Sequence, residues 1–288
     1  MAKISFSGKH VVVTGGGSGI GRALAHEFAH EGAARVSITD IDQDRIDRVL
    51  SELRGKGVEA AGYRVDHGSE EETRLWAEKL LGEGVPVDVL CANAGVAAAG
   101  MLGSMQMDNW RWVMGVNVMG VAYTIHYLLP SMIERGSGSI LITASGAAMV
   151  PGPAMGCYNA SKAAACSLGE TLSIELADKG INVCVICPGI ISTEIAKNSR
   201  VDFDNDVMNR TTMKNSIEYY QSKKAVDPAV VARDALKGLR SNKLLVVTPW
   251  SHVGPAWLLR RLAPEWFNRR IALPKWRKGE MISGVRTR

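Results

Sequence analysis

The sequence has few of the features that mark secreted, membrane-spanning or disulfide-stabilised proteins. Its five cysteines are an odd number in a chain of 288 residues, which is long enough to fold without disulfide bonds. No uninterrupted apolar run approaches the ~20 residues that a transmembrane helix needs, and the first residues do not resemble a signal peptide. We therefore expect a cytoplasmic protein with reduced thiols.

The cysteine pattern also argues against a metal site. Cys184 and Cys187 form an isolated C-x-x-C pair in a segment that we expect to be an extended strand. Side chains three residues apart on a strand point to opposite faces. The two thiols therefore cannot converge on one ion, and we predict no metal.

Positive charge is scarce in most of the chain. The net charge is +5, but residues 251–288 hold nine Lys and Arg against two Asp and Glu, whereas residues 1–250 hold 25 against 27. A nucleic-acid-binding protein needs a basic face on its folded body. We expect no nucleic-acid partner, and we expect the basic residues 251–288 to form a separate extension.

What the sequence does contain is a regular alternation of apolar, strand-like runs with longer helical patterns such as Gly19–His30 and Gln43–Arg54. Strands at this spacing, with helices between them, indicate right-handed crossovers and a parallel sheet with helices on both faces. The predicted strands are His10–Thr14, Arg35–Thr39, Val58–Val65, Val87–Cys91, Gly138–Thr143, Ile181–Ile186 and Lys243–Val247. We predict one α/β domain over residues 1–250, with a polar, irregular substrate lid at about 193–225.

A glycine-rich loop follows the first predicted strand and leads into the first helix. The loop reads Thr14-Gly15-Gly16-Gly17-Ser18-Gly19-Ile20-Gly21. Glycines at such a turn let the backbone approach a pyrophosphate, which then faces the free N–H groups at the helix start. No Gly-Lys-Ser/Thr follows, which excludes a P-loop. The position of the loop predicts a dinucleotide site.

The second strand ends at Asp40, nineteen residues after Gly21. A carboxylate there accepts hydrogen bonds from the adenosine ribose and repels a 2′-phosphate. Neither Ser18 nor Ile41 is basic, so nothing nearby attracts that phosphate. We predict NAD as cofactor, with NADP less suited. Asp40 could instead cap the next helix, although Asp42 is better placed for that role.

Two further strand ends fall on the same edge of the predicted sheet. Asp66 follows the third strand and is placed to face the adenine, while the small residues of Asn93-Ala94-Gly95 follow the fourth and are placed along the cofactor. Each is equally well a turn residue taken alone. Ligands of open α/β sheets bind at this edge, so together these residues outline one groove.

A third group of residues has catalytic chemistry. Tyr158 and Lys162 are four residues apart in a predicted helix, Met155–Ala177, and therefore share one face. An ammonium beside a phenol lowers the pKa of the phenol and makes Tyr158 a proton donor or acceptor. Ser145, at the end of the fifth strand, is placed to hydrogen-bond the same substrate oxygen.

The sequence resembles the short-chain dehydrogenase/reductase family from about Ser7 to Pro249. The motifs that carry the resemblance are T-G-G-G-S-G-I-G at Thr14–Gly21, N-A-G at Asn93–Gly95, Asn117 in V-N-V-M-G, Ser145, Y-N-A-S-K at Tyr158–Lys162 and P-G-I-I-S-T at Pro188–Thr193. Several ordered motifs in one chain are a specific signal. The resemblance implies a Rossmann-type, doubly wound sheet of about seven parallel strands and a homodimer or homotetramer.

The resemblance also implies roles for individual residues. Asn117, Ser145, Tyr158 and Lys162 would form a catalytic tetrad, in which Tyr158 is the general acid/base. Lys162 would hold the nicotinamide ribose and Asn117 would position a water. The residues that would contact the nicotinamide are Pro188, Gly189, Ile191 and Thr193.

Two positions depart from the usual pattern of the family. His67 stands beside Asp66, where a small apolar residue is common, and Cys157 precedes Tyr158. We still expect His67 to border the cofactor site. Cys157 is interpreted as a small helix residue, with sensitivity to thiol reagents as the alternative.

The reaction that these residues predict is hydride transfer between NAD and a neutral alcohol or ketone, with an apolar secondary alcohol as the expected substrate. The loops Val96–Met101 and Gly146–Gly156 contain no charged residue to hold an anionic group. An NADPH-dependent carbonyl reductase is the enzymatic alternative. A dinucleotide-binding sensor or scaffold without turnover is the alternative from another class.

The C-terminal extension contains two similar stretches that start at Pro255 and Pro264. Each combines a tryptophan, Trp257 or Trp266, with aliphatic residues and paired arginines, and each proline suits the first turn of a helix. Such stretches can pack on a second subunit or over the substrate pocket, contact a membrane surface peripherally, or stay disordered.

Overall fold

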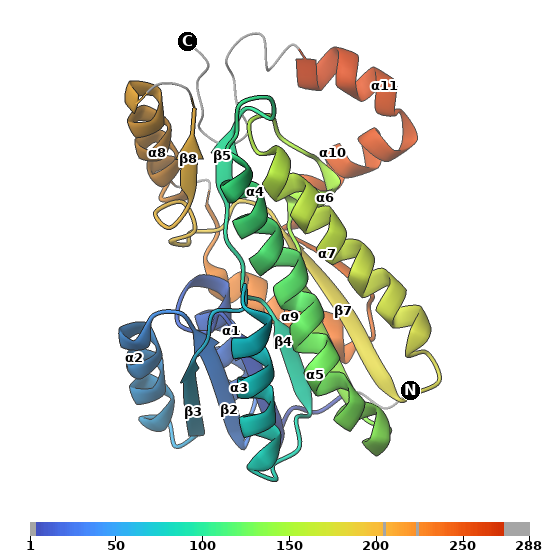
Figure 1. Ribbon diagram of the computed structural model, residues 1–288. Coiled ribbons are helices and arrows are strands. Elements are labelled where there is room, and N and C mark those ends of the chain that lie inside the picture. The colour runs from blue at the N-terminus through green and yellow to red at the C-terminus, as the bar shows by residue number, and fades with distance from the viewer. Residues whose placement is uncertain (1–3, 204–205, 223–224, 274–288) are drawn as a thin grey trace.

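A computed structural model describes residues 4–203, 206–222 and 225–273 (Figure 1). Seven strands form one parallel sheet in the order β3-β2-β1-β4-β6-β7-β9. Their bounds are β1 His10–Thr14, β2 Arg35–Asp40, β3 Glu59–Arg64, β4 Val89–Ala92, β6 Gly138–Thr143, β7 Ile181–Pro188 and β9 Leu245–Thr248. The predicted Rossmann-type sheet of about seven strands is confirmed, and each predicted strand overlaps an observed one.

Helices cover both faces of this sheet and create two apolar cores. On one face lie α1 (Gly19–His30), α2 (Gln43–Arg54) and α9 (Pro228–Arg240), and on the other lie α3 (Glu70–Gly82), α5 (Gly120–Arg135) and α7 (Gly156–Glu175). The strands contribute to both cores because alternate side chains point to opposite faces. Cys184 lies in the first core and Cys187 in the second, as predicted from their spacing.

The order of the strands places the functional edge. The chain runs outward from β1 to β2 and β3, returns to β4 on the other side of β1, and then continues outward in the opposite direction. The loops after β1 and β4 therefore diverge and leave a crevice between them, which is where open α/β sheets bind ligands. The α2 helix begins with Asp42 as its cap, since its side chain accepts a hydrogen bond from the Arg45 N–H. Asp42 is thus the cap residue that we expected, and Asp40 is left to face the crevice.

A second, two-stranded sheet stands above this crevice. It pairs β5 (Ala98–Gly100) with β8 (Arg200–Asp202), and β8 is followed by α8 (Asp206–Tyr220). The expectation that residues 193–225 are irregular was wrong. β8 forms because it pairs with β5 (Figure 1). The two strands are far apart in the sequence, so the periodicity of residues 193–225 alone does not predict this pairing.

One long helical run crosses the face opposite α1. It consists of α4 (Met107–Met114), a π-helical turn η1 (Gly115–Met119) and α5. By length and composition alone, one helix of the described residues, Met107–Arg135, could cross a membrane, although it contains no uninterrupted apolar run of that length. In the structure it packs against α3 and α7, so it serves as a layer of the domain.

The extension begins directly after β9. It forms α10 (Trp250–Leu262), α11 (Pro264–Phe267) and a second π-helical turn, η2 (Asn268–Ala272). Pro264 opens α11 as predicted, but Pro255 lies inside α10. The helix starts five residues earlier, and Pro255 gives up the N–H that would bond to the Ser251 carbonyl, a loss that remains close to the helix start. Residues 274–288 lie outside the described part of the chain.

The short α6 helix (Gly146–Met149) lies between β6 and α7 and packs against α10.

Candidate active site

A cavity of about 490 Å³ lies at the carboxyl edge of the large sheet. Almost every residue proposed from sequence lines it. The exceptions are Thr14 and Asn117, which are buried and do not line the cavity. The predicted residues that line the cavity are Gly15, Ser18, Gly19, Ile20, Gly21, Asp40, Ile41, Asp66, His67, Asn93, Ala94, Gly95, Ser145, Tyr158, Lys162, Pro188, Gly189, Ile191 and Thr193. The separate sequence motifs therefore form one site.

The glycine-rich loop has the geometry that requires glycine. Gly15 and Gly19 have backbone φ values of +64° and +51°, which residues other than glycine rarely adopt. A Cβ on Gly21 would lie 2.0 Å from the carbonyl oxygen of Gly15, so the loop and the start of α1 are in direct contact. A larger residue at position 21 would push the loop away from the helix that a pyrophosphate would face.

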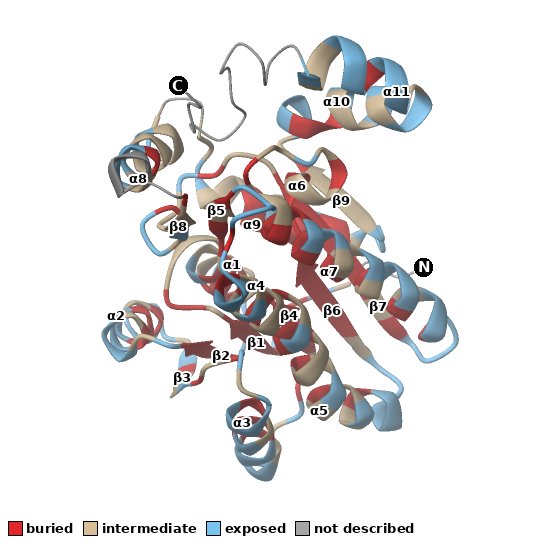
Figure 2. Ribbon diagram, turned by 45° about the horizontal axis from the view of Figure 1, so that its top comes forward, coloured by how far each residue is buried: buried red, intermediate tan, exposed pale blue. Residues whose placement is uncertain are grey.

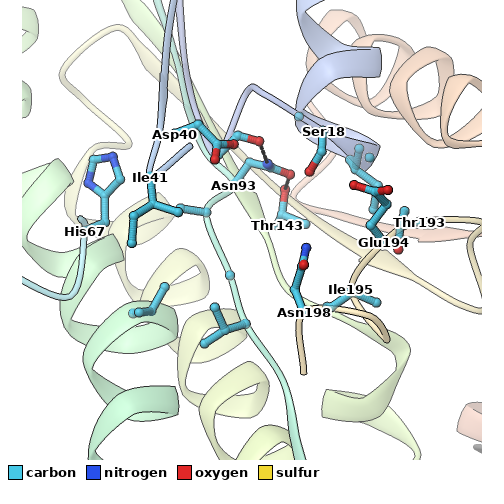
Figure 3. A pocket seen from close by; sticks show the side chains of 18 of the residues that line it. Ser18, Asp40, Ile41, His67, Asn93, Thr143, Thr193, Glu194, Ile195 and Asn198 are labelled. Carbon is cyan, nitrogen blue, oxygen red and sulfur yellow. Dashed lines mark hydrogen bonds between the residues drawn. The ribbon is translucent and has the colours of Figure 1, made fainter. Parts of the chain in front are cut away.

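A hydrogen-bond network joins the ends of three neighbouring strands beneath the loop. The Thr14 hydroxyl accepts hydrogen bonds from the N–H groups of Asn93 and Ala94, at 2.9 and 3.0 Å. The Asn93 amide nitrogen donates to the carbonyl oxygen of Thr14 at 3.0 Å, and its amide oxygen accepts from the Thr143 hydroxyl at 3.0 Å (Figure 3). Thr14 therefore acts as a support for the cavity floor and does not line it.

Asp40, the last residue of β2, lines the cavity. One of its carboxylate oxygens accepts a hydrogen bond from the Gly17 N–H at 3.0 Å, which ties the end of β2 to the glycine loop. The neighbouring Ile41 is an exposed apolar residue, 59% accessible, on the cavity wall. Such a surface suits the flat face of an adenine.

Arg45 is a cation in the cavity wall that sequence reasoning did not identify. Its guanidinium lies 3.3 Å from the carboxylate of Asp42 and 3.1 Å from that of Glu194. Because two carboxylates surround it, Arg45 is a weak attractor for an additional phosphate. The pair with Glu194 also links α2 to the segment that follows β7.

His67 lies against the cavity but is held by the interior of the domain. It is hydrogen-bonded to the Thr39 hydroxyl at 2.7 Å and stacks edge-on against Trp76. Burial lowers the pKa of His67 to about 4, so the ring is neutral at neutral pH. This unusual residue thus contributes a neutral wall and no charge.

Tyr158 projects from the first turn of α7 towards Ser145, the cap residue of α6. Burial raises the pKa of Tyr158 above its ordinary value, and a hydrogen bond with the Ser145 side chain acts in the opposite direction. We predicted that Lys162 lowers this pKa; in the structure burial raises it instead, and the group that acts to lower it is the Ser145 hydroxyl. The two hydroxyl groups nonetheless lie together in the cavity, where both can contact one substrate oxygen.

Lys162 follows one turn later on α7. Its ammonium donates a hydrogen bond to the carbonyl oxygen of Thr143 at 2.9 Å and lies 6.0 Å from the centre of the Tyr158 ring. Burial lowers the pKa of Lys162 to about 8. A Cβ on Gly95 would lie 3.0 Å from this nitrogen, so the glycine leaves room for the lysine.

Asn117 is fully buried in η1 beneath the cavity. Its amide oxygen accepts from the Val96 N–H at 2.8 Å, and its nitrogen donates to the Val96 carbonyl and the Ser161 hydroxyl, both at 2.9 Å. These bonds fasten the loop after β4 to α7. A π-helical turn is a frequent feature of functional sites, but no local pattern in the sequence predicts it.

The thiol of Cys157 is buried within a small apolar cluster beside Ala98 and does not line the cavity. Burial raises the pKa of Cys157, which disfavours the reactive thiolate. The interpretation of this cysteine as a small helix residue agrees with its position.

The cavity is also lined by residues that the sequence did not identify. They come from α4, η1, α8 and the segment after Thr193: Trp112, Val116, Ile195, Asn198 and Tyr220. Burial raises the pKa of Tyr220, and the nearby Tyr158 adds to that effect. These side chains come from segments that are far apart in the sequence and meet only in the folded chain.

Comparison with known proteins identifies the family. Residues 9–203 match the family model described as short chain dehydrogenase. The human protein named dehydrogenase/reductase SDR family member 2, mitochondrial, is 38% identical over 188 residues, which is 65% of this chain and 66% of that protein. The chain belongs to the short-chain dehydrogenase/reductase family and is an oxidoreductase of that family.

Solved structures extend the likeness beyond the sequence match. A short-chain dehydrogenase/reductase from Burkholderia phymatum, in complex with NAD, has a TM-score of 0.82 at 30% identity and covers 91% of this chain and 96% of its own. A 7α-hydroxysteroid dehydrogenase complexed with NADH and 7-oxo glycochenodeoxycholic acid has a TM-score of 0.73 at 28% identity, covering 86% and 95%. The two structures share the fold of this chain and bind a nicotinamide dinucleotide.

Proposed function

We propose that the protein interconverts a neutral, apolar secondary alcohol and its ketone with NAD as the hydride carrier. The observation that carries the proposal is the convergence of Ser145, Tyr158 and Lys162 on one cavity that also contains the glycine loop and Asp40. A protein that only binds a dinucleotide has no use for a phenol, a hydroxyl and an ammonium at this point.

The residues present fit a nicotinamide dinucleotide. Gly15 to Gly21 would hold the pyrophosphate, Asp40 and Ile41 the adenosine, and Pro188 to Thr193 the nicotinamide, as the family resemblance implies. A Cβ on Gly19 would lie 3.1 Å from the Thr193 side chain, so glycine keeps the space between these two segments open. When bound, NAD supplies the acceptor for the hydride that leaves the carbinol carbon.

The chain itself provides the proton and the polar contacts. During oxidation Tyr158 accepts the hydroxyl proton while the carbon–oxygen double bond forms, and during reduction it returns that proton to the carbonyl oxygen. Ser145 donates a hydrogen bond to the same oxygen. Because burial raises the pKa of Tyr158, oxidation should accelerate and reduction should slow as the pH rises.

The preference for NAD follows from Asp40 and Arg45. Asp40 is placed to accept from ribose hydroxyls, and Arg45 already has two carboxylate partners. An NADPH-dependent carbonyl reductase is the second candidate, because Arg45 does line the cavity. Affinities for NADH and NADPH, measured separately, decide between them.

The preference for a neutral substrate follows from the substrate half of the cavity. Its walls are Val96, Trp112, Val116, Ile195 and Tyr220, and Asn198 supplies a polar but uncharged contact. An anionic group would be desolvated there without a cationic partner. The cytoplasmic location and the homodimeric or homotetrameric state stay predictions.

The test is a panel of secondary alcohols of increasing size, neutral and anionic, assayed for NADH formation. Tyr158→Phe should lower kcat by roughly 10²–10⁴-fold and leave NADH binding intact. Tyr127→Phe is the matched control, since that hydroxyl bonds to Glu70 on the surface. Equal turnover by the wild type and Tyr158→Phe would remove Tyr158 from the mechanism, and a preference for anionic substrates would contradict the substrate class.

A further inference from the structure

The C-terminal extension has an apolar face that holds it to the domain. Val253 is buried, and Trp257 packs against the core that α5 and α7 share with the sheet. The guanidinium of Arg260 donates a hydrogen bond to the Met149 carbonyl at the end of α6, at 2.6 Å. This side of α10 is therefore anchored. None of the three tryptophans of the described extension, Trp250, Trp257 and Trp266, is among the residues lining the cavity, so they do not cover the substrate.

The other side of α10 is apolar as well, and it faces solvent. Leu258 and Leu259 are 43% and 36% exposed, and Leu262 is 83% exposed. The surface continues onto α11 and η2 with Trp266, 51% exposed, and Leu273, 39% exposed. We call these five residues the extension face. Exposed apolar side chains that follow one another along a helical segment indicate a contact surface.

Arginines border the extension face. Arg261, Arg269 and Arg270 are exposed, while Glu265 is the acidic residue between Trp250 and Leu273. Figure 2 shows α10 and α11 at one end of the molecule, with exposed residues along their outer sides. Tryptophan and leucine next to exposed arginines are typical of helices that lie in the interface of an anionic membrane.

We propose that the extension face binds the surface of membranes that contain anionic lipids. Leu258, Leu262 and Trp266 would enter the boundary between headgroups and acyl chains, and the arginines would contact lipid phosphates. Each arginine near an anionic membrane adds an electrostatic attraction to the lipid headgroups, and dissolved salt screens this attraction. The sequence of residues 274–288 contains five Lys and Arg and one Glu, so its net charge is also positive.

Charge also decides against a second copy of this chain as the occupant. In a two-fold symmetric dimer the same patch occurs on both partners. Such a dimer would bring Arg261, Arg269 and Arg270 of both chains into one interface, with only Glu265 of each chain, 3.6 Å from Arg269, to offset them. An anionic lipid surface offers the complementary charge and a second copy does not.

The test is co-sedimentation of the full chain with vesicles of neutral phosphatidylcholine and with vesicles that also contain phosphatidylserine. We expect binding to the anionic vesicles, at least tenfold weaker binding to the neutral ones, and release at high salt. Leu258→Ser with Leu262→Ser should reduce binding at least tenfold, and so should Arg269→Glu with Arg270→Glu. The matched control is Leu75→Ser with Ile133→Ser, two exposed residues on α3 and α5, the latter within the membrane-compatible helix.

Each variant is checked for NADH binding and for melting temperature, so that unfolding is not mistaken for lost membrane contact. Equal binding to both vesicle types would overturn the role of charge, and no binding would overturn the proposal. A fall in oligomeric state caused by the leucine substitutions, measured by analytical ultracentrifugation, would assign the extension face to a second copy. Loss of binding in the Leu75 and Ile133 control alone would assign membrane contact to the other helices. None of these outcomes depends on turnover, so failure here leaves the proposed reaction standing.

Discussion

The ammonium of Lys162 donates a hydrogen bond to the main-chain oxygen of Thr143, which ends the strand next to its helix. This contact fixes the lysine beside Tyr158 without a carboxylate partner. The buried charge is therefore hydrogen-bonded to a neutral carbonyl oxygen, which only partly offsets the free-energy cost of removing the ammonium from water. That imbalance is measurable as a dependence of stability on pH.

The first prediction concerns this lysine. Its pKa is lowered to about 8 in the folded protein, so between that pH and its ordinary value the unfolded chain binds more protons, and stability rises with pH. Relative to Lys162→Met, the wild type should gain about 2 kcal/mol between pH 8 and 9.5. Urea unfolding without cofactor measures this. Lys179→Met, on the surface, should follow the wild type; parallel curves for Lys162→Met would mean that the lysine is not desolvated.

The second prediction concerns His67 at the opposite end of the pH scale. Burial lowers the pKa of His67 to about 4 in the folded protein. Between that pH and about 6.5 the unfolded chain binds a proton at His67 that the folded protein does not bind, so the free energy of unfolding falls as the pH drops below about 6.5. His67→Gln should lose about 3 kcal/mol less than the wild type between pH 6.5 and 4. The exposed His30→Gln is the control, and an unchanged acid limb in His67→Gln would contradict the assignment.

The third prediction concerns cofactor choice. Asp40→Asn keeps the size of the side chain but removes the charge that repels a 2′-phosphate. NADPH affinity should rise at least tenfold while NADH affinity falls, as measured by quenching of protein fluorescence. Asp44→Asn, exposed on α2, is the matched control. Improved NADPH binding in both variants would point to the general charge of the region and away from Asp40.

The fourth prediction concerns the glycine loop. A Cβ on Gly21 would lie 2.0 Å from the Gly15 carbonyl oxygen, whereas nothing lies within 4 Å of a Cβ on Gly82 at the end of α3. Gly21→Ala should cost about 2 kcal/mol or more and abolish NADH binding. Gly82→Ala should instead stabilise the protein by about 0.5–1 kcal/mol. Normal NADH binding by Gly21→Ala would show that the loop can move without consequence.

The sequence predicted the large sheet well because its central strands, such as β1 and β6, are buried on both faces. Runs such as Val11–Val13 and Ile140–Ile142 are apolar throughout, and that pattern survives in any tertiary context. The β5–β8 sheet was not predicted because Ala98–Gly100 and Arg200–Asp202 are too short to show a periodic pattern of apolar residues. Their pairing depends on a contact between segments about a hundred residues apart.

The same distinction separates the two halves of the site. The glycine loop, Asp40 and the Tyr158–Lys162 pair are local motifs with fixed spacing, and they were predicted. Trp112 and Tyr220 reach the cavity from elements placed by the fold. The pKa of Tyr158 was also beyond local reasoning, because desolvation depends on everything that surrounds the ring.

The Thr14 hydroxyl accepts hydrogen bonds from two main-chain N–H groups in the loop after β4. These two amides allow opening of the cavity floor to be followed by hydrogen–deuterium exchange. Amide protons held in this way exchange with deuterium only when their bonds open. The exchange rates of the Asn93 and Ala94 amides therefore report how often β1 and β4 separate at the base of the crevice. Thr14→Val, which lacks the acceptor oxygen, should turn two slow amides into fast ones.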